Sequence, residues 1–267
     1  MKVHWDAKYR EPDPPPPETP QAAAARVAWR TCGVTEDLAG FVRRFGLADK
    51  SILDIGAGRG RYQDIVADYT AVDISSEAAR YFHKPFYVGS ATALPFGDSR
   101  FDAAWSLWVL EHVPNPEWAL NEMRRVVKPG GLIYLAPAWD CNSWAATGAG
   151  ARPYSELPLK LWPVKASLLV REFKPYRAFC RSAVRSVRFA QARLAGGPVR
   201  FRYRTLTPNY EHYWASDADA VSSLDRFEAY LWFTSRGDEC VSCGSTLREM
   251  FARDRPLIIR VNKAGAR

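Results

Sequence analysis

The sequence lacks the long apolar stretches that mark membrane-spanning and secreted proteins. Its longest apolar runs, such as 132–138, fall far short of the roughly 20 residues that a helix needs to cross a bilayer. The first residues, MKVHWDAKYREPDPPPP, contain no apolar core of the kind found in a secretory signal. We therefore expect a cytoplasmic protein, either free or peripheral to the membrane.

Cysteine is also scarce, and its number is odd. Five scattered cysteines in a 267-residue chain predict a reducing compartment and no disulfide framework. Cys240 and Cys243 have C-x-x-C spacing, but no second cysteine pair or histidine stands nearby to complete the four ligands of a zinc site. We expect no metal, and we place this pair on a strand with alternate residues buried.

Acidic residues are almost missing from one segment. Residues 151–205 hold thirteen Lys or Arg but only Glu156 and Glu172, a balance of +11. Because the whole chain carries +8, the remainder carries 8 − 11 = −3. A nucleic-acid binder more often spreads its positive charge over the fold, so this basic block calls for a separate explanation.

Short apolar runs alternate with helical patterns along much of the chain, which predicts a parallel sheet with helices on both faces. Residues 1–20 read as a proline-rich tail. Strands are predicted at 51–55, 70–74, 86–88, 101–107, 132–137, 238–241 and 256–262. Helices are predicted at 21–44, 61–67, 76–82, 117–127 and 219–235.

The first strand runs into a glycine-rich turn. Its spacing is D-x-G-x-G-x-G, with Asp54 followed by Gly56, Gly58 and Gly60. The dinucleotide pattern G-x-G-x-x-G fails, because Arg61 stands sixth from Gly56. Alternating glycines let the backbone approach the polar end of a ligand. The alternative is a tight turn without a ligand.

A second acidic residue ends the next strand. Asp73 lies 19 residues after Asp54, where a carboxylate can accept both hydroxyls of a ribose. Ile74 would then lie against the adenine face. The alternative for Asp73 is to cap the helix that follows.

Three further stretches extend this pattern: GSATALPF…FDAAWS (89–106), VLEHV (109–113) and EMRRVVKPGG (122–131). Together with the glycine turn they resemble the class I S-adenosylmethionine-dependent methyltransferases of the type 11 group, from about 51 to 137. The chain departs from that family at Ser90, where an acidic residue usually receives the adenine amino group. A serine hydroxyl can still accept such a hydrogen bond.

The resemblance implies a doubly wound α/β fold with a seven-stranded, mostly parallel sheet. It also implies S-adenosylmethionine as cofactor and S-adenosylhomocysteine as product. The matching positions predict the residues that bind the cofactor: Asp54, Gly56, Ala57, Gly58, Gly60, Tyr62, Asp73, Ile74, Ser90, Ala91 and Leu107.

His112 follows the fourth strand, where the family's fold faces the transferable methyl group. An imidazole titrates near ~6.5 and suits a general base, although a role in shaping the pocket is the alternative. We expect the acceptor site to be lined by Trp108, His112, Tyr210 and His212. Trp108 could equally belong to the core, and His212 could be a satisfied surface histidine.

The basic block predicts an amphipathic helix over 175–194, separated by Pro175 from an apolar segment before it. One face holds Tyr176, Cys180, Ala183, Val187, Ala190 and Leu194, and another holds Arg177, Arg181, Arg185 and Arg188. In one interpretation, it is a lid whose apolar face packs on the core while its arginines meet water. It could instead contact an anionic acceptor or membrane surface, or hold RNA.

We therefore predict a methyltransferase core over 21–137 and 208–267, with a basic helical insertion at 138–207. The predicted reaction is in-line transfer of a methyl group to an oxygen or nitrogen of a small-molecule, lipid-linked or glycan-linked acceptor. Two alternatives remain. One is an RNA methyltransferase, and the other is a catalytically silent module that binds the cofactor and acts through protein or membrane contacts.

Overall fold

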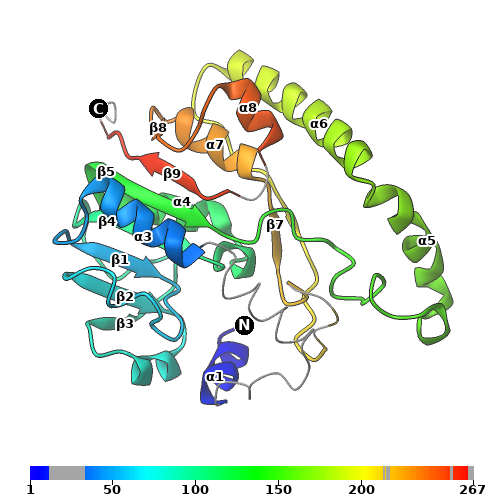
Figure 1. Cartoon of the computed structure of the whole chain (residues 1–267), viewed down its shortest axis with the longest axis horizontal. Helices are drawn as coiled ribbons and strands as arrows, with labels where there is room; N and C mark the ends of the chain where they lie inside the picture. The colour runs from blue at the N-terminus through cyan, green and yellow to red at the C-terminus, as the bar shows by residue number, and fades with distance from the viewer. Residues whose placement is uncertain (12–33, 213, 215–216, 253–254, 264–267) are drawn as a thin grey trace.

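A seven-stranded sheet organises the protein (Figure 1), in a computed structural model that describes residues 1–11, 34–212, 214, 217–252 and 255–263. The strand order is β3-β2-β1-β4-β5-β9-β8. Only the β5–β9 and β8–β9 pairs of this sheet are antiparallel, which confirms the predicted mostly parallel sheet. Its strands are β1 (Ile52–Ile55), β2 (Tyr69–Asp73), β3 (Phe86–Val88), β4 (Phe101–Leu107), β5 (Val127–Ala136), β8 (Glu239–Cys240) and β9 (Leu257–Arg260).

Helices cover both faces of the sheet, because its central strands are buried on both sides. Helix α3 (Val34–Phe45) packs on one face through Leu38, Phe41 and Val42. Helices α4 (Pro116–Val126) and α7 (Arg226–Thr234) contribute buried side chains to the cluster on the other face. The fold is therefore the predicted doubly wound α/β arrangement.

Two further helices lie outside these layers and form an arc along one side of the molecule (Figure 1). They are α5 (Trp162–Arg171) and α6 (Lys174–Ala195), which we call the arm. Pro175 stands in the first turn of α6 and separates the two helices as predicted. Helix α6 packs against α7 and α8 (Thr246–Phe251). Beyond the arm, β6 (Tyr203–Thr205) and β7 (Ser222–Leu224) form a two-stranded ribbon.

The arm packs the opposite way from the lid interpretation. Arg185 and Arg188 of α6 are buried, and Arg181 is largely covered. Val187 and Leu194, which the lid interpretation places on the core, are 59% and 87% exposed. The amphipathic period was correct, but the face assigned to the core was wrong, because the arginines find acidic partners on the body of the protein.

Two predicted helices also differ. Residues 61–67 form a series of turns, with only i→i+3 hydrogen bonds such as that from the Ile65 amide to the Tyr62 carbonyl. The helix predicted from 219 begins at Arg226, because the Asp225 side chain accepts from the Phe227 amide and caps it. The proline-rich stretch and the first part of the helix predicted at 21–44 lie outside the described residues.

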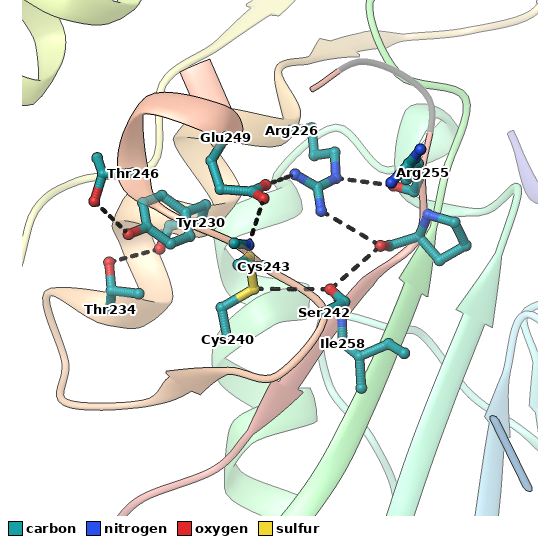
Figure 2. Close-up of a disulfide and its surroundings, with 12 residues drawn as sticks. Arg226, Tyr230, Thr234, Cys240, Ser242, Cys243, Thr246, Glu249, Arg255 and Ile258 are labelled. Atoms are coloured by element: carbon teal, nitrogen blue, oxygen red, sulfur yellow. Dashed lines mark hydrogen bonds and ion pairs between the residues drawn. A yellow bond between two sulfur atoms is a disulfide. The ribbon is translucent and has the colours of Figure 1, made fainter. Parts of the chain in front are cut away.

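The C-x-x-C pair forms a disulfide, which corrects the expectation of reduced cysteines (Figure 2). The Cα atoms of Cys240 and Cys243 lie 5.3 Å apart across a tight turn after β8. The following helix α8 carries Glu249, which forms a buried ion pair with Arg226 of α7. Arg226 also donates to the carbonyl of Arg255, so this cluster joins α7, α8 and the start of β9.

Candidate active site

The glycine turn after β1 has the backbone conformation that only glycine adopts easily. Gly56, Gly58 and Gly60 have φ angles of 73°, 55° and 68°. A Cβ atom on Gly56 would collide with the side chain of Val109. The three glycines therefore permit a tight turn at the carboxyl end of a central strand, the edge at which ligands bind in open α/β sheets.

Asp73 ends the neighbouring strand β2 and lies directly beside this turn. Its Oδ2 accepts from the Gly58 amide at 2.9 Å, and its Oδ1 accepts from the Ser75 amide at 3.0 Å. Burial raises the pKa of this carboxyl, while these amide hydrogen bonds oppose that rise. Ser75 rather than Asp73 caps the short helix η1 (Ser76–Tyr81), by accepting from the Glu77 amide. The capping alternative for Asp73 is therefore wrong.

Asp54 is enclosed below the turn. It is 2% exposed, and its Oδ2 accepts from the Tyr69 hydroxyl at 2.7 Å. Burial raises the pKa of this carboxyl to about 7. In this arrangement Asp54 supports the strand end from inside, while Asp73 and the glycine amides form the surface of the turn.

Helix α1 (Lys2–Arg10) lies over this surface, within the segment predicted as a tail. The ring of Tyr9 packs against Gly58, and its hydroxyl hydrogen-bonds the carboxylate of Asp73. Arg59 donates to the carbonyls of Lys8 and Glu11. These contacts close the turn from outside, at the carboxylate that was expected to accept ribose hydroxyls.

The remaining residues predicted to bind the cofactor line the same edge of the sheet or its loops. Ala57 and Leu107 are buried or nearly so, and Tyr62, Ile74 and Ala91 are half-buried. Ser90 lies after β3, where its hydroxyl accepts from the Thr92 amide at 3.2 Å and pairs with the Thr92 hydroxyl at 2.8 Å. A local turn therefore already engages the serine that stands in place of the usual acid.

His112 ends the short helix η2 (Leu110–His112) after β4. Its Nδ1 lies 3.4 Å from the carbonyl oxygen of Asp219, which can only accept, so the proton belongs on Nδ1 and Nε2 holds the lone pair. Burial lowers the pKa of this imidazole and favours its neutral form. The ring of Trp5 from α1 packs edge-on against it, with ring centres 5.0 Å apart. His112 thus has the protonation state of a base.

An acidic cluster surrounds His112. Glu111 is 1% exposed, and its Oε1 lies 3.9 Å from Nε2 of His112. Burial first, and then the charges of Asp217 and Asp219, raise the pKa of Glu111 to about 8. Lys8 of α1 places its Nζ 3.7 Å from the Asp219 carboxylate. Glu111 is therefore largely neutral at pH 7 and can share a proton with the imidazole.

A cavity of about 460 Å³ adjoins this cluster at Asp217. Its wall combines the loop after β5 with the start of α6, through Trp139, Asp140, Cys141, Asn142, Trp144, Ala145, Gly148, Gly150, Ala151, Glu172, Arg177, Arg181 and Asp217. Arg181 binds the Asp140 carboxylate at 2.9 Å within this wall. The size suits a small organic molecule, and the two tryptophans provide flat apolar surfaces beside paired charges.

The structure separates the residues that were expected to line the acceptor site. Trp108 lies next to the glycine turn's neighbour Val109 and has a φ of 53°, a strained conformation for a tryptophan. Tyr210 stacks on His4 of α1, with ring centres 4.4 Å apart. His212 is exposed and stacks on Trp214. Only Trp108 and His112 therefore lie at the end of β4, and none of the four lines the cavity.

Sequence reasoning missed the residues of the cavity, because they come from three distant segments. Trp139 and Asp140 follow β5, Arg177 and Arg181 come from α6, and Asp217 precedes β7. The usable signal was position, since Trp139 comes shortly after the carboxyl end of a central strand. Nothing in the sequence placed α6 against that loop.

Residues 53–135 match the family described as a methyltransferase domain. Demethylmenaquinone methyltransferase of Renibacterium salmoninarum is 39% identical over 94 residues, which cover 32% of this chain and 40% of that protein. The enzyme of the same name from Mycobacterium tuberculosis is 32% identical over 151 residues, 54% of this chain and 60% of that one. The chain thus spans about two fifths to three fifths of the length of these relatives.

A solved structure of the amino pentose methyltransferase CalS10 from Micromonospora echinaspora, with S-adenosylmethionine bound, resembles part of the fold. It is 19% identical, covers 43% of this chain and 56% of its own, and has a TM-score of 0.37.

Proposed function

We propose that this chain, whose residues 53–135 belong to the class I S-adenosylmethionine-dependent methyltransferases, moves the methyl group of that cofactor to an oxygen or nitrogen of a small or lipid-linked acceptor. One observation carries the proposal. The positive-φ glycine turn after β1 and the carboxylate of Asp73 after β2 stand side by side at the carboxyl ends of adjacent parallel strands.

The residues at this edge fit the cofactor. Amides of the turn at 56–60 would hold its polar end, and Asp73 would accept from its ribose hydroxyls. Ile74 and Leu107 would supply apolar contact. The cofactor, when bound, provides a methyl group on a positively charged sulfur, which makes that methyl electrophilic.

His112 and its neighbours would handle the proton of the acceptor. The neutral imidazole, held through Nδ1 by the Asp219 carbonyl, presents Nε2 as the atom that takes a proton from an acceptor hydroxyl or ammonium group. Glu111 and Trp5 cover the ring and keep water from it. The cavity beyond Asp217 would hold the body of the acceptor.

Relatives with informative names support the acceptor class. Two are named for demethylmenaquinone, and one from Synechocystis, 33% identical over 134 residues, is named for 2-methyl-6-phytyl-1,4-hydroquinone. A phytyl group is a long hydrocarbon chain, so we place a lipid-linked acceptor before a nucleic acid.

The test is a transfer assay with methyl-labelled cofactor, using hydroquinone and polar-lipid extracts in one arm and total RNA in the other. We expect the label in the organic phase, and a loss of about 100-fold in rate for His112→Asn with cofactor affinity unchanged. Label in RNA would contradict the acceptor class. Cofactor binding with no transfer to either arm would contradict the enzyme and favour the silent module.

A further inference from the structure

The arm gathers apolar side chains on its outer side. Of nineteen exposed large apolar residues among the described part of the chain, ten lie within 159–194. They are Leu159, Trp162, Leu169, Val170, Phe173, Tyr176, Phe179, Val184, Val187 and Leu194, which we call the outer face. A cluster of this density on a soluble domain marks a surface that contacts something else.

Helix α6 shows that this exposure is built into the fold. Tyr176, Phe179, Val187 and Leu194 recur at helical spacing on one side. The opposite side is fixed to the body by ion pairs. Arg185 binds Asp225 at 2.9 Å, and Arg188 binds Glu228 at 2.9 Å.

Further hydrogen bonds fix the orientation of α6. Arg185 donates to the carbonyls of Met250 and Ala252, both at 2.8 Å, and Arg188 donates to the carbonyl of Arg200 at 2.8 Å. A rotation that hid the apolar side would break these contacts and leave buried charges unpaired. The outer face therefore stays exposed while the fold is intact.

The charge of the arm is strongly one-sided. Residues 159–194 contain nine Lys or Arg and a single acid, Glu172. Among the cations outside the ion pairs with the body, Lys160, Arg171 and Arg193 are exposed. They lie at the start, the middle and the far end of the arm, in line with its apolar residues. Long basic side chains beside apolar ones can reach anionic headgroups while the apolar groups enter the layer below.

This combination selects among the possible occupants. A second copy of the chain would bring two basic arms together in a symmetric interface, which like charges oppose. RNA would need the arginines of α6, but three of them, Arg181, Arg185 and Arg188, already bind carboxylates. An anionic lipid surface complements both the apolar side chains and the remaining positive charge.

We propose that the outer face of the arm docks the protein on an anionic lipid bilayer, with α5 and α6 lying in the interface. Within the described residues, no helix has the length and apolar character needed for a span, so the contact is with one leaflet. The cavity wall includes Glu172, Arg177 and Arg181, from the junction of the two helices and the start of α6. Docking would thus bring the cavity close to the lipid. The proposal stands on the arm alone and does not depend on the proposed methyl transfer.

The test is sedimentation of the full chain with vesicles of phosphatidylcholine alone and with added phosphatidylglycerol. We expect binding to the anionic vesicles, weaker binding to the neutral ones, and partial release by salt. The triple variant Phe179→Ser, Val184→Ser, Val187→Ser should lower the partition coefficient by about tenfold or more. These side chains are exposed, so the fold should survive, and circular dichroism and thermal unfolding check this.

The matched control is Trp118→Ser, which removes an equally exposed aromatic residue, 62% exposed, from α4. This variant should bind vesicles like the parent chain. Equal binding by the triple variant and the parent, or no vesicle binding by the parent, would overturn the proposal. A dimer of the parent that becomes a monomer in the triple variant would also overturn it, since the occupant would then be a second copy.

Discussion

The sheet and the arm bury ionisable side chains in opposite ways. Under the sheet's carboxyl edge, Asp54 and Glu111 are buried acids whose pKa values are raised to about 7 and about 8. In the arm, Arg185 and Arg188 are buried as ions against Asp225 and Glu228. The sheet therefore tolerates acids by keeping them near neutrality, whereas the arm uses charge as its means of attachment.

The difference has a consequence for each region. The sheet's edge should respond to pH, because protons move on and off groups near the proposed reaction centre. The arm should respond to loss of a charged partner and much less to pH. It can also leave its apolar side facing outward, because its attachment does not use that side.

Removal of one buried cation should break the comparison most severely. Arg185→Ala leaves Asp225 without its partner and two carbonyls without donors, so we expect a loss of about 3 kcal/mol in the free energy of unfolding. The matched control is Arg193→Ala, an exposed arginine on the same helix, which should change it by less than about 0.5 kcal/mol. Urea unfolding measures both. Equal effects would show that the arm does not depend on its ion pairs.

The helix α1 sharpens the comparison at the sheet's edge. The Tyr9 hydroxyl hydrogen-bonds Asp73, the carboxylate that the ribose would need. Tyr9→Phe removes that bond and keeps the ring against Gly58, so the cofactor should bind severalfold more tightly, by about 1 kcal/mol. Calorimetry measures the affinity, and Tyr87→Phe, on the half-exposed edge strand β3, is the control. Weaker binding by Tyr9→Phe would mean that the hydroxyl helps to hold the cofactor.

The pH response should be the smallest effect. Burial raises the pKa of Glu111 from 4.5 to about 8, so between these values the folded chain holds a proton that the unfolded chain has lost. Stability therefore falls as pH rises through this window, and Asp54 adds the same sign up to about 7. The melting temperature should drop by several degrees from pH 6 to pH 9, and the drop should be smaller in Glu111→Gln. Identical slopes would place the titration elsewhere.

Short-range patterns were sufficient for the sheet and its glycine turn. The strand at 52–55, the glycines after it and the acid at 73 all lie within one β-turn-β stretch, so spacing alone defined their geometry. The helix predicted at 61–67 failed because Gln63 is tied to residues 81–83 instead, through the Tyr81 carbonyl and the His83 amide.

Contacts between distant segments were out of reach. The helical period of α6 was visible, but its orientation depends on Asp140, Asp225 and Glu228, each more than thirty residues from its arginine. The seat of α1 on the glycine turn, and the cavity between the loop after β5 and α6, depend on the same kind of long-range contact. The Cys240–Cys243 bond was missed because composition was weighed above local turn geometry.

The most direct test of the central claim is a calorimetric titration with S-adenosylmethionine and S-adenosylhomocysteine. We predict one site per chain with micromolar affinity for the parent, and at least about tenfold weaker binding for Asp73→Asn, which keeps the side chain's shape but loses the charged acceptor. A thermal unfolding check on Asp73→Asn separates loss of binding from loss of fold. Absence of binding by the parent to either compound, or full affinity in a folded Asp73→Asn, would contradict the cofactor site described here.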